Sequence, residues 1–146
     1  ASSDYATITV RGNGGHGAMP HKASDALVAA ASLVMALQTV VSRNVDPMET
    51  AVVTVGSLHA GKASNVIPEF ATLELSVRSF KPEVRALLAL ELREMPRPAL
   101  FLAAKAYAQY GRRGGSKGAG REQALHYDVS WPRKCGGSVQ PRRDLD

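Results

Sequence analysis

A glycine-rich stretch around one histidine, GNGGHG at residues 12–17, constrains this chain more than any other segment. Glycine adopts positive φ angles without strain, so the backbone can turn tightly around His16 and present its ring to a ligand. The spacing also fits G-x-G-x-x-G, the dinucleotide-binding fingerprint. That motif needs a helix that opens among the glycines, yet Pro20 follows them, and the second predicted strand lacks the terminal acidic residue that would hold a ribose. We therefore interpret the stretch as a loop that carries a histidine.

Three segments have the patterns of strands. Residues 5–11 and 70–78 alternate apolar and polar side chains, and residues 50–58 are rich in β-branched side chains. An amphipathic helix with Ser24 as its N-cap and a length of about five turns is predicted between the first two of these strands along the chain.

A second helix is predicted to open at Pro82, with an apolar stripe that ends at Met95. The order is then β-α-β-β-α. It predicts an α/β fold of the α+β kind, a ferredoxin-like two-layer sandwich in which both helices cover one face of the sheet.

The sequence does not clearly predict the last strand of that fold. Pro96 and Pro98 end the second helix, and residues 111–121 are glycine-rich, basic and without a pattern. Residues 127–131 are the only further strand candidate, and a weak one. We therefore predict one domain at residues 1–95 and an atypical tail at residues 96–146, either disordered or foreign to the domain, as a shifted reading frame or a fused segment would produce.

The positive charge of the chain is confined to that tail. Residues 1–95 hold eight basic and nine acidic side chains, whereas residues 96–146 hold ten and four. The predicted domain thus has no surface suited to a phosphate backbone, and nucleic acid is not expected as a partner; a nucleic-acid-binding tail is the weakest alternative. No apolar run reaches the roughly 20 residues of a membrane span, no targeting segment is visible, and Cys135 is the single cysteine. We expect a soluble, cytoplasmic protein.

Three sequence blocks recur together in one known group of proteins. They are GGHGAMPH at residues 14–21 followed by Asp25, GKASNVIP at residues 61–68, and VRS at residues 77–79. In this order and spacing they resemble the dimerisation domain, or lid, of the zinc-dependent aminoacylase and carboxypeptidase superfamily. The likeness is greatest to its branch of hippurate hydrolases and N-acyl-amino-acid amidohydrolases, and it covers residues 1 to about 95.

The resemblance implies roles for three residues. His16 would reach into the active site of the partner subunit and donate a hydrogen bond to the oxyanion of the tetrahedral intermediate, while Asn65 and Arg78 would hold the carboxylate of the substrate. The chemistry is reasonable, because an imidazole N–H can stabilise an oxyanion and a guanidinium group matches a carboxylate. From the residues alone, a cap of the turn before an extended segment is the favoured interpretation of Asn65, whereas for Arg78 an ordinary exposed charge at a strand end and a carboxylate ligand fit equally well.

The resemblance also implies that the chain is part of an enzyme that cleaves N-acyl amino acids, hippurate-like amides, with two divalent metal ions, zinc being expected. The sequence has no cluster of histidine and acidic residues of the kind that a two-zinc hydrolase needs. We therefore predict no metal site and no cofactor in this chain, and no activity for the chain alone, with the metal ions in a catalytic domain outside it.

The expected partners are a second copy, in a homodimer formed through the lid domain, the catalytic domain, and a small amide substrate. A different class of function is also open. The chain could be a non-catalytic ferredoxin-like module, regulatory or binding a small anion through His16 and Arg78.

Overall fold

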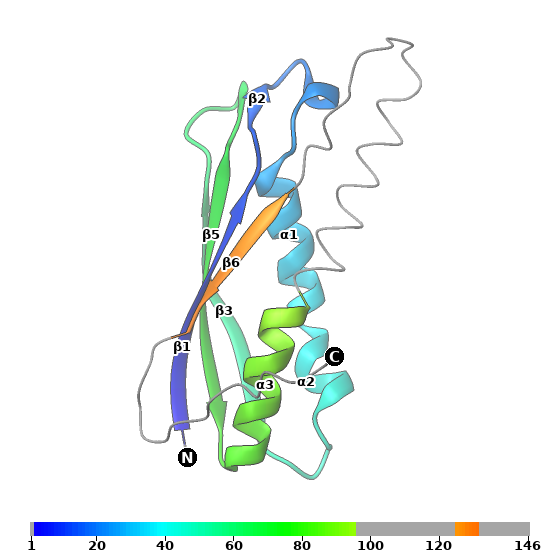
Figure 1. Ribbon diagram of the computed structural model, residues 1–146, viewed down its shortest axis with the longest axis vertical. Helices are drawn as coiled ribbons and strands as arrows, with labels where there is room; N and C mark the ends of the chain where they lie inside the picture. Colours follow the sequence, from blue (N-terminus) through cyan, green and yellow to red (C-terminus); the bar gives the residue numbers. More distant parts are fainter. Residues whose placement is uncertain (1, 96–124, 132–146) are drawn as a thin grey trace, which may run out of the picture.

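The computed structural model describes residues 2–95 and 125–131, in which four antiparallel strands form the main sheet. In the order in which they neighbour one another, these are β3 (Ala51–Ala60), β5 (Phe70–Ser79), β1 (Ser2–Arg11) and β6 (His126–Ser130). Three helices lie on one face of this sheet (Figure 1): α1 (Ala26–Leu37), α2 (Thr39–Asn44) and α3 (Pro82–Glu94). The prediction of a ferredoxin-like two-layer sandwich is confirmed.

The core lies between the sheet and the helices, because each central strand has one apolar face. Along β5, residues 71, 73, 75 and 77 are buried alanine, leucine or valine, and the residues between them are exposed or half-buried. The helices contribute leucines that are almost fully buried: Leu33, Leu37, Leu88 and Leu92. None of the described helices lies on the other sheet face, and the β5 side chains on that face are exposed or half-buried.

The last strand of the fold, which the sequence did not clearly predict, is β6. It pairs with β1 so that Val129 lies opposite Ile8. The Tyr127 hydroxyl donates a hydrogen bond to the Arg93 carbonyl, 3.0 Å away, near the end of α3. These five residues come from the segment that the sequence pattern set apart as a tail, yet they complete the sheet. The apolar stretch 99–110 and the glycine-rich stretch 111–121 lie outside the described residues.

The first helix differs from its prediction at both ends. Its N-cap is Asp25 rather than Ser24. The Asp25 carboxylate accepts hydrogen bonds from the backbone N–H groups of Leu27 and Val28, at 2.9 and 3.1 Å. The helix does not run on for five turns, because it is interrupted at Gln38, whose side-chain amide donates to the Val34 carbonyl. None of the described helices is both long and apolar enough to cross a bilayer.

Two very short strands, absent from the predictions, shape the end of the molecule opposite the N-terminus. β2 (Gly15–His16) pairs antiparallel with β4 (Val66–Ile67), with His16 opposite Val66. A 3-10 turn, η1 (Pro20–Lys22), lies between β2 and α1. Figure 1 shows β2 at one end of the molecule and the N-terminus at the other.

Candidate functional site

The His16 loop, defined as residues 12–24, connects β1 to α1 and holds His16 in an exposed position. Gly14 has a φ of 55°, and a Cβ atom there would lie 2.8 Å from the Ile67 carbonyl oxygen. Only glycine combines that backbone angle with so close an approach to a neighbouring backbone. The glycines of the loop therefore allow β2 to pair with β4 and bring His16 beside the segment that carries Asn65.

The His16 ring accepts a hydrogen bond from its own loop. The backbone N–H of Ala18 donates to Nδ1 of His16 over 3.1 Å. Because Nδ1 must keep its lone pair to accept this bond, the proton of the neutral ring is on Nε2. The loop thus selects the tautomer in which the outer nitrogen is the donor.

Asn65 lies close to His16 because a backbone hydrogen bond joins Asn65 to Gly17, the residue after His16. Gly17 donates its N–H to the Asn65 carbonyl over 2.8 Å. A Cβ atom on Gly17 would lie 3.0 to 3.2 Å from the backbone O, C and Cα atoms of Asn65, closer than most such contacts. The structure therefore brings two of the three predicted site residues, His16 and Asn65, to one end of the molecule, and both are exposed.

Arg78 lies at the opposite end of the sheet. It pairs with Ser3 on one side and with Val52 on the other, whereas the β5 residue nearest the Asn65 loop is Phe70. Eight steps along a strand correspond to about 26 Å, farther than any side chain reaches. Arg78 is exposed and lies between the buried Val77 and Ser79, so its side chain is on the sheet face opposite the core. A single copy of the chain does not bring Arg78 to His16 and Asn65.

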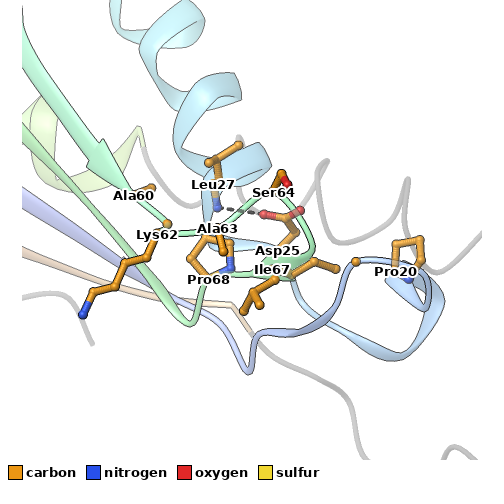
Figure 2. A pocket seen from close by; sticks show the side chains of 12 residues that line it. Pro20, Asp25, Leu27, Ala60, Lys62, Ala63, Ser64, Ile67 and Pro68 are labelled. Atoms are coloured by element: carbon orange, nitrogen blue, oxygen red, sulfur yellow. Dashed lines mark hydrogen bonds between the residues drawn. The ribbon is translucent and has the colours of Figure 1, made fainter.

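An open pocket of about 580 Å³ lies between the segment 60–68 and the start of α1. In Figure 2 its wall includes Pro20, Ile67 and Pro68, and the Asp25 carboxylate is engaged by the Leu27 N–H. The Lys62 side chain extends away from Asp25. His16, Asn65 and Arg78 are not among the residues that line it. The pocket is thus next to the two loops but is not formed by the predicted site residues.

Residues 2–95 and 125–131 contain no group of three or more histidine, cysteine or acidic side chains placed to hold a metal ion. This part of the chain does not supply a ligand set for the metal ions that the resemblance implies. The chemistry that its site residues can offer is hydrogen-bond donation by an imidazole and binding of an anion by an amide and a guanidinium group.

Residues 2–95 match the family described as the peptidase dimerisation domain. The chain belongs to this family. Over 87 residues it is 53% identical to hippurate hydrolase from Campylobacter jejuni, and over 88 residues 53% identical to N-acetyldiaminopimelate deacetylase from Streptococcus sanguinis. Each alignment covers 60% of this chain and 23% of the relative. The resemblance stated from the three sequence blocks is confirmed.

Solved structures agree with this family assignment. A protein assigned as an aminohydrolase from methicillin-resistant Staphylococcus aureus superposes with a TM-score of 0.67 at 30% identity, over 88% of this chain and 28% of that one. AtUAH in complex with (S)-hydroxyglycine superposes with a TM-score of 0.59 at 27% identity, over 69% of this chain and 24% of that one. This dimerisation domain therefore spans about a quarter of the length of the relatives that it matches.

The sequence analysis does not predict one interaction of the dimerisation domain, the contact between Asn13 and Ser24. Asn13 and Ser24, at the two ends of the His16 loop, are joined by three hydrogen bonds. Ser24 was interpreted as a helix cap because serine precedes a helical pattern, but its hydroxyl is engaged with Asn13. An asparagine among glycines and a serine eleven residues later were the only sequence signals.

Proposed function

We propose that this chain is the lid and dimerisation domain of a metal-dependent amidohydrolase that cleaves N-acyl amino acids, hippurate-like amides. Family membership supports the domain type. The two relatives named above support the substrate class, because hippurate and N-acetyldiaminopimelate each carry an acylated nitrogen beside a carboxylate. The metal ions, two and expected to be zinc, belong in this proposal to a catalytic domain within the remaining length of the enzyme.

The observation that carries the proposal is the hydrogen bond from Ala18 to His16 Nδ1. It leaves Nε2–H as the donor of an exposed ring on a loop tied to the Asn65 loop. A donor held in place before the reaction stabilises an oxyanion by a few kcal/mol, since no further reorganisation is needed when charge develops. In our proposal His16 makes this bond in the active site of the partner subunit.

The separation of Arg78 from His16 and Asn65 supports a site shared by two subunits. If Asn65 and Arg78 bind the same carboxylate, the distance of about 26 Å along β5 must be bridged by a second copy of the chain. A carboxylate as the bound group is in keeping with AtUAH, which was solved with (S)-hydroxyglycine and with glyoxylate, both small carboxylic acids.

We infer that the homodimer forms through β3, an edge strand of the sheet that the described residues form. This strand is ten residues long, lies at one edge of the sheet, and contains no charged residue and no proline to discourage pairing. An isologous dimer places two copies of β3 antiparallel about a two-fold axis. The Arg78 end of one sheet then lies beside the Asn65 end of the other, because Arg78 neighbours Val52 at the start of β3 and Asn65 follows its end.

The test uses two variants of the full-length enzyme, His16→Ala and Arg78→Ala, mixed to form heterodimers. If one site takes His16 from one subunit and Arg78 from the other, each heterodimer has one intact site and one doubly defective site. About half of the wild-type activity per dimer should return.

The opposite assignment gives a different result. If both residues of a site come from one subunit, every site in the mixture keeps one defect and activity stays at the level of the separate variants. A mixture whose kcat/KM stays at the level of the separate variants, although heterodimers are shown to form, would therefore overturn the shared site. A second mixture, His16→Ala with a subunit inactivated at its metal site, should also recover about half of the activity if His16 acts in trans.

A further inference from the structure

The His16 loop has few means of holding its shape other than hydrogen bonds. Residues 15–22 are all exposed, so side-chain packing contributes little to the position of His16. The outer part of the loop is tied by the pairing of β2 with β4 and by the Gly17–Asn65 bond. Its inner part, where β1 ends and α1 begins, is tied by the Gly12 N–H, which donates to the Glu69 carbonyl over 2.6 Å, and by a second connection across the base of the loop.

That connection is the Asn13–Ser24 bridge, which we define as the three hydrogen bonds between these residues. The Asn13 backbone N–H donates to Ser24 Oγ over 2.8 Å, and Ser24 Oγ donates to Asn13 Oδ1 over 2.8 Å. The Ser24 backbone N–H also donates to Asn13 Oδ1. One carbonyl oxygen thus accepts two bonds, and the first and last parts of the loop are joined through a residue, Ser24, that is only 7% exposed.

We propose that Asn13 is a positioning residue for His16: its side-chain oxygen closes the base of the loop and so fixes the ring that the proposed function uses. The inference rests on that function for its consequence in the reaction, but the geometry stands without it. Asn13 is three residues from His16, and displacement of a reacting group by about 1 Å can lower a rate by roughly a hundredfold.

If the bridge positions His16, two substitutions of Asn13 should have opposite effects on the loop. Asn13→Ala removes the acceptor and leaves both Ser24 donors without it, whereas Asn13→Asp keeps an oxygen at the same place. The side-chain nitrogen of Asn13, Nδ2, makes none of the three bonds, so the carboxylate should restore the bridge. Asn44→Ala is a matched control, because Asn44 is exposed and its side chain donates to Glu91 on α3, outside the His16 loop.

The first measurement uses the 146-residue chain and needs no activity. Amide ¹⁵N relaxation gives the order parameters of His16 and Gly17, and the ring ¹⁵N shifts of His16 report its tautomer. In the wild type and in Asn44→Ala we expect order parameters near those of β1, about 0.85, and the Nε2–H tautomer. In Asn13→Ala the order parameters should fall below about 0.6 and the preference for one tautomer should be lost, with both restored in Asn13→Asp.

Ser24→Ala provides a second break of the same bridge if Asn13→Ala does not fold. It removes two of the three bonds while keeping the Ser24 N–H, so it should loosen His16 in the same direction. Unchanged order and tautomer of His16 in a folded variant of either kind would overturn the inference.

The second measurement is the activity of the full-length enzyme with the same variants. We expect Asn13→Ala to lower kcat about tenfold to a hundredfold with a smaller change in KM, and Asn13→Asp to recover most of it. A loop that is loosened in Asn13→Ala while kcat stays at the wild-type value would support the bridge and contradict the proposed role of His16. A lower kcat with an unchanged His16 ring would instead overturn Asn13 as a positioning residue.

Discussion

His16 depends on a backbone donor two residues along the chain for its proposed chemistry. The Ala18 N–H occupies Nδ1, so the neutral ring can donate only from Nε2. A histidine on an unstructured loop would exchange between two tautomers and would spend part of its time with the outer nitrogen as an acceptor. A fixed tautomer is what a donor to an oxyanion requires.

Replacement of His16 tests this donor directly. In the full-length enzyme, His16→Ala should lower kcat by roughly two to three orders of magnitude and change KM much less, because the bond forms only as the oxyanion develops. Steady-state kinetics measure both constants. His21→Ala is the control, since His21 lies in the same exposed loop on η1. An equal loss of kcat in both variants would point to a disturbed loop instead of a missing donor.

Truncation of Arg78 should affect mainly KM, whereas truncation of His16 should affect mainly kcat. Arg78→Ala removes an interaction that the substrate and the transition state share, so it should raise KM more than it lowers kcat. Arg78→Lys should restore only part of the affinity, because an ammonium group cannot bind a carboxylate through two parallel bonds. Arg43→Ala, at an exposed position on α2, controls for the loss of a positive charge. Wild-type KM in Arg78→Ala would remove Arg78 from the proposed site.

The close approach of two loops is a property of the elements β2 and β4 and of the turns beside them. Gly17 and Asn65 approach so closely that a methyl group on Gly17 meets three backbone atoms, which a change of rotamer cannot relieve. The approach exists only because β2 and β4 pair and draw the loops together.

Gly17→Ala should therefore lower the free energy of unfolding by about 1–3 kcal/mol and lower kcat as well, since it pushes the His16 and Asn65 loops apart. Urea unfolding and steady-state kinetics measure the two effects. Gly56→Ala in β3 is the matched control, because a Cβ atom there would lie 3.7 Å from the nearest neighbour, an ordinary contact. If the two variants are equally stable, the contact at Gly17 is less tight than described.

At the scale of the whole molecule, the sheet that the described residues form is open and has two different edge strands, β3 and β6. The β6 edge has five residues, and one of them, Asp128, is charged, whereas the β3 edge has ten and none is charged. A long edge without charges is the better template for a second strand. A dimer built on β3 would also account for a site whose residues lie at opposite ends of one chain.

A lysine at the middle of this edge should weaken the dimer. We expect Thr54→Lys to shift the chain toward monomer in sedimentation velocity experiments, because two added charges meet at the two-fold axis. Thr72→Lys adds the same charge to the same sheet face but on the central strand β5, and it should leave the dimer intact. Equal dimer dissociation constants for the two variants would show that β3 is not the interface.

The sequence by itself determined most of the fold and the family. Alternation along residues 70–78 identified β5, the proline at position 82 identified the start of α3, and the three sequence blocks identified the dimerisation domain. These signals are local, because a strand with one buried face must alternate and a proline fits only the first turn of a helix. His16 and Asn65 were predicted as site residues from the same blocks; the structure adds that they lie at one end of the molecule, and their roles stay predictions.

The tertiary structure alone decided what depends on residues far apart in the sequence. The strand β6 is weak as a pattern and exists because β1 offers it an open edge. Ser24 is a loop bridge and not a helix cap because Asn13 lies opposite its hydroxyl. In each case the deciding contact joins segments whose approach is set by the packing of the whole sheet.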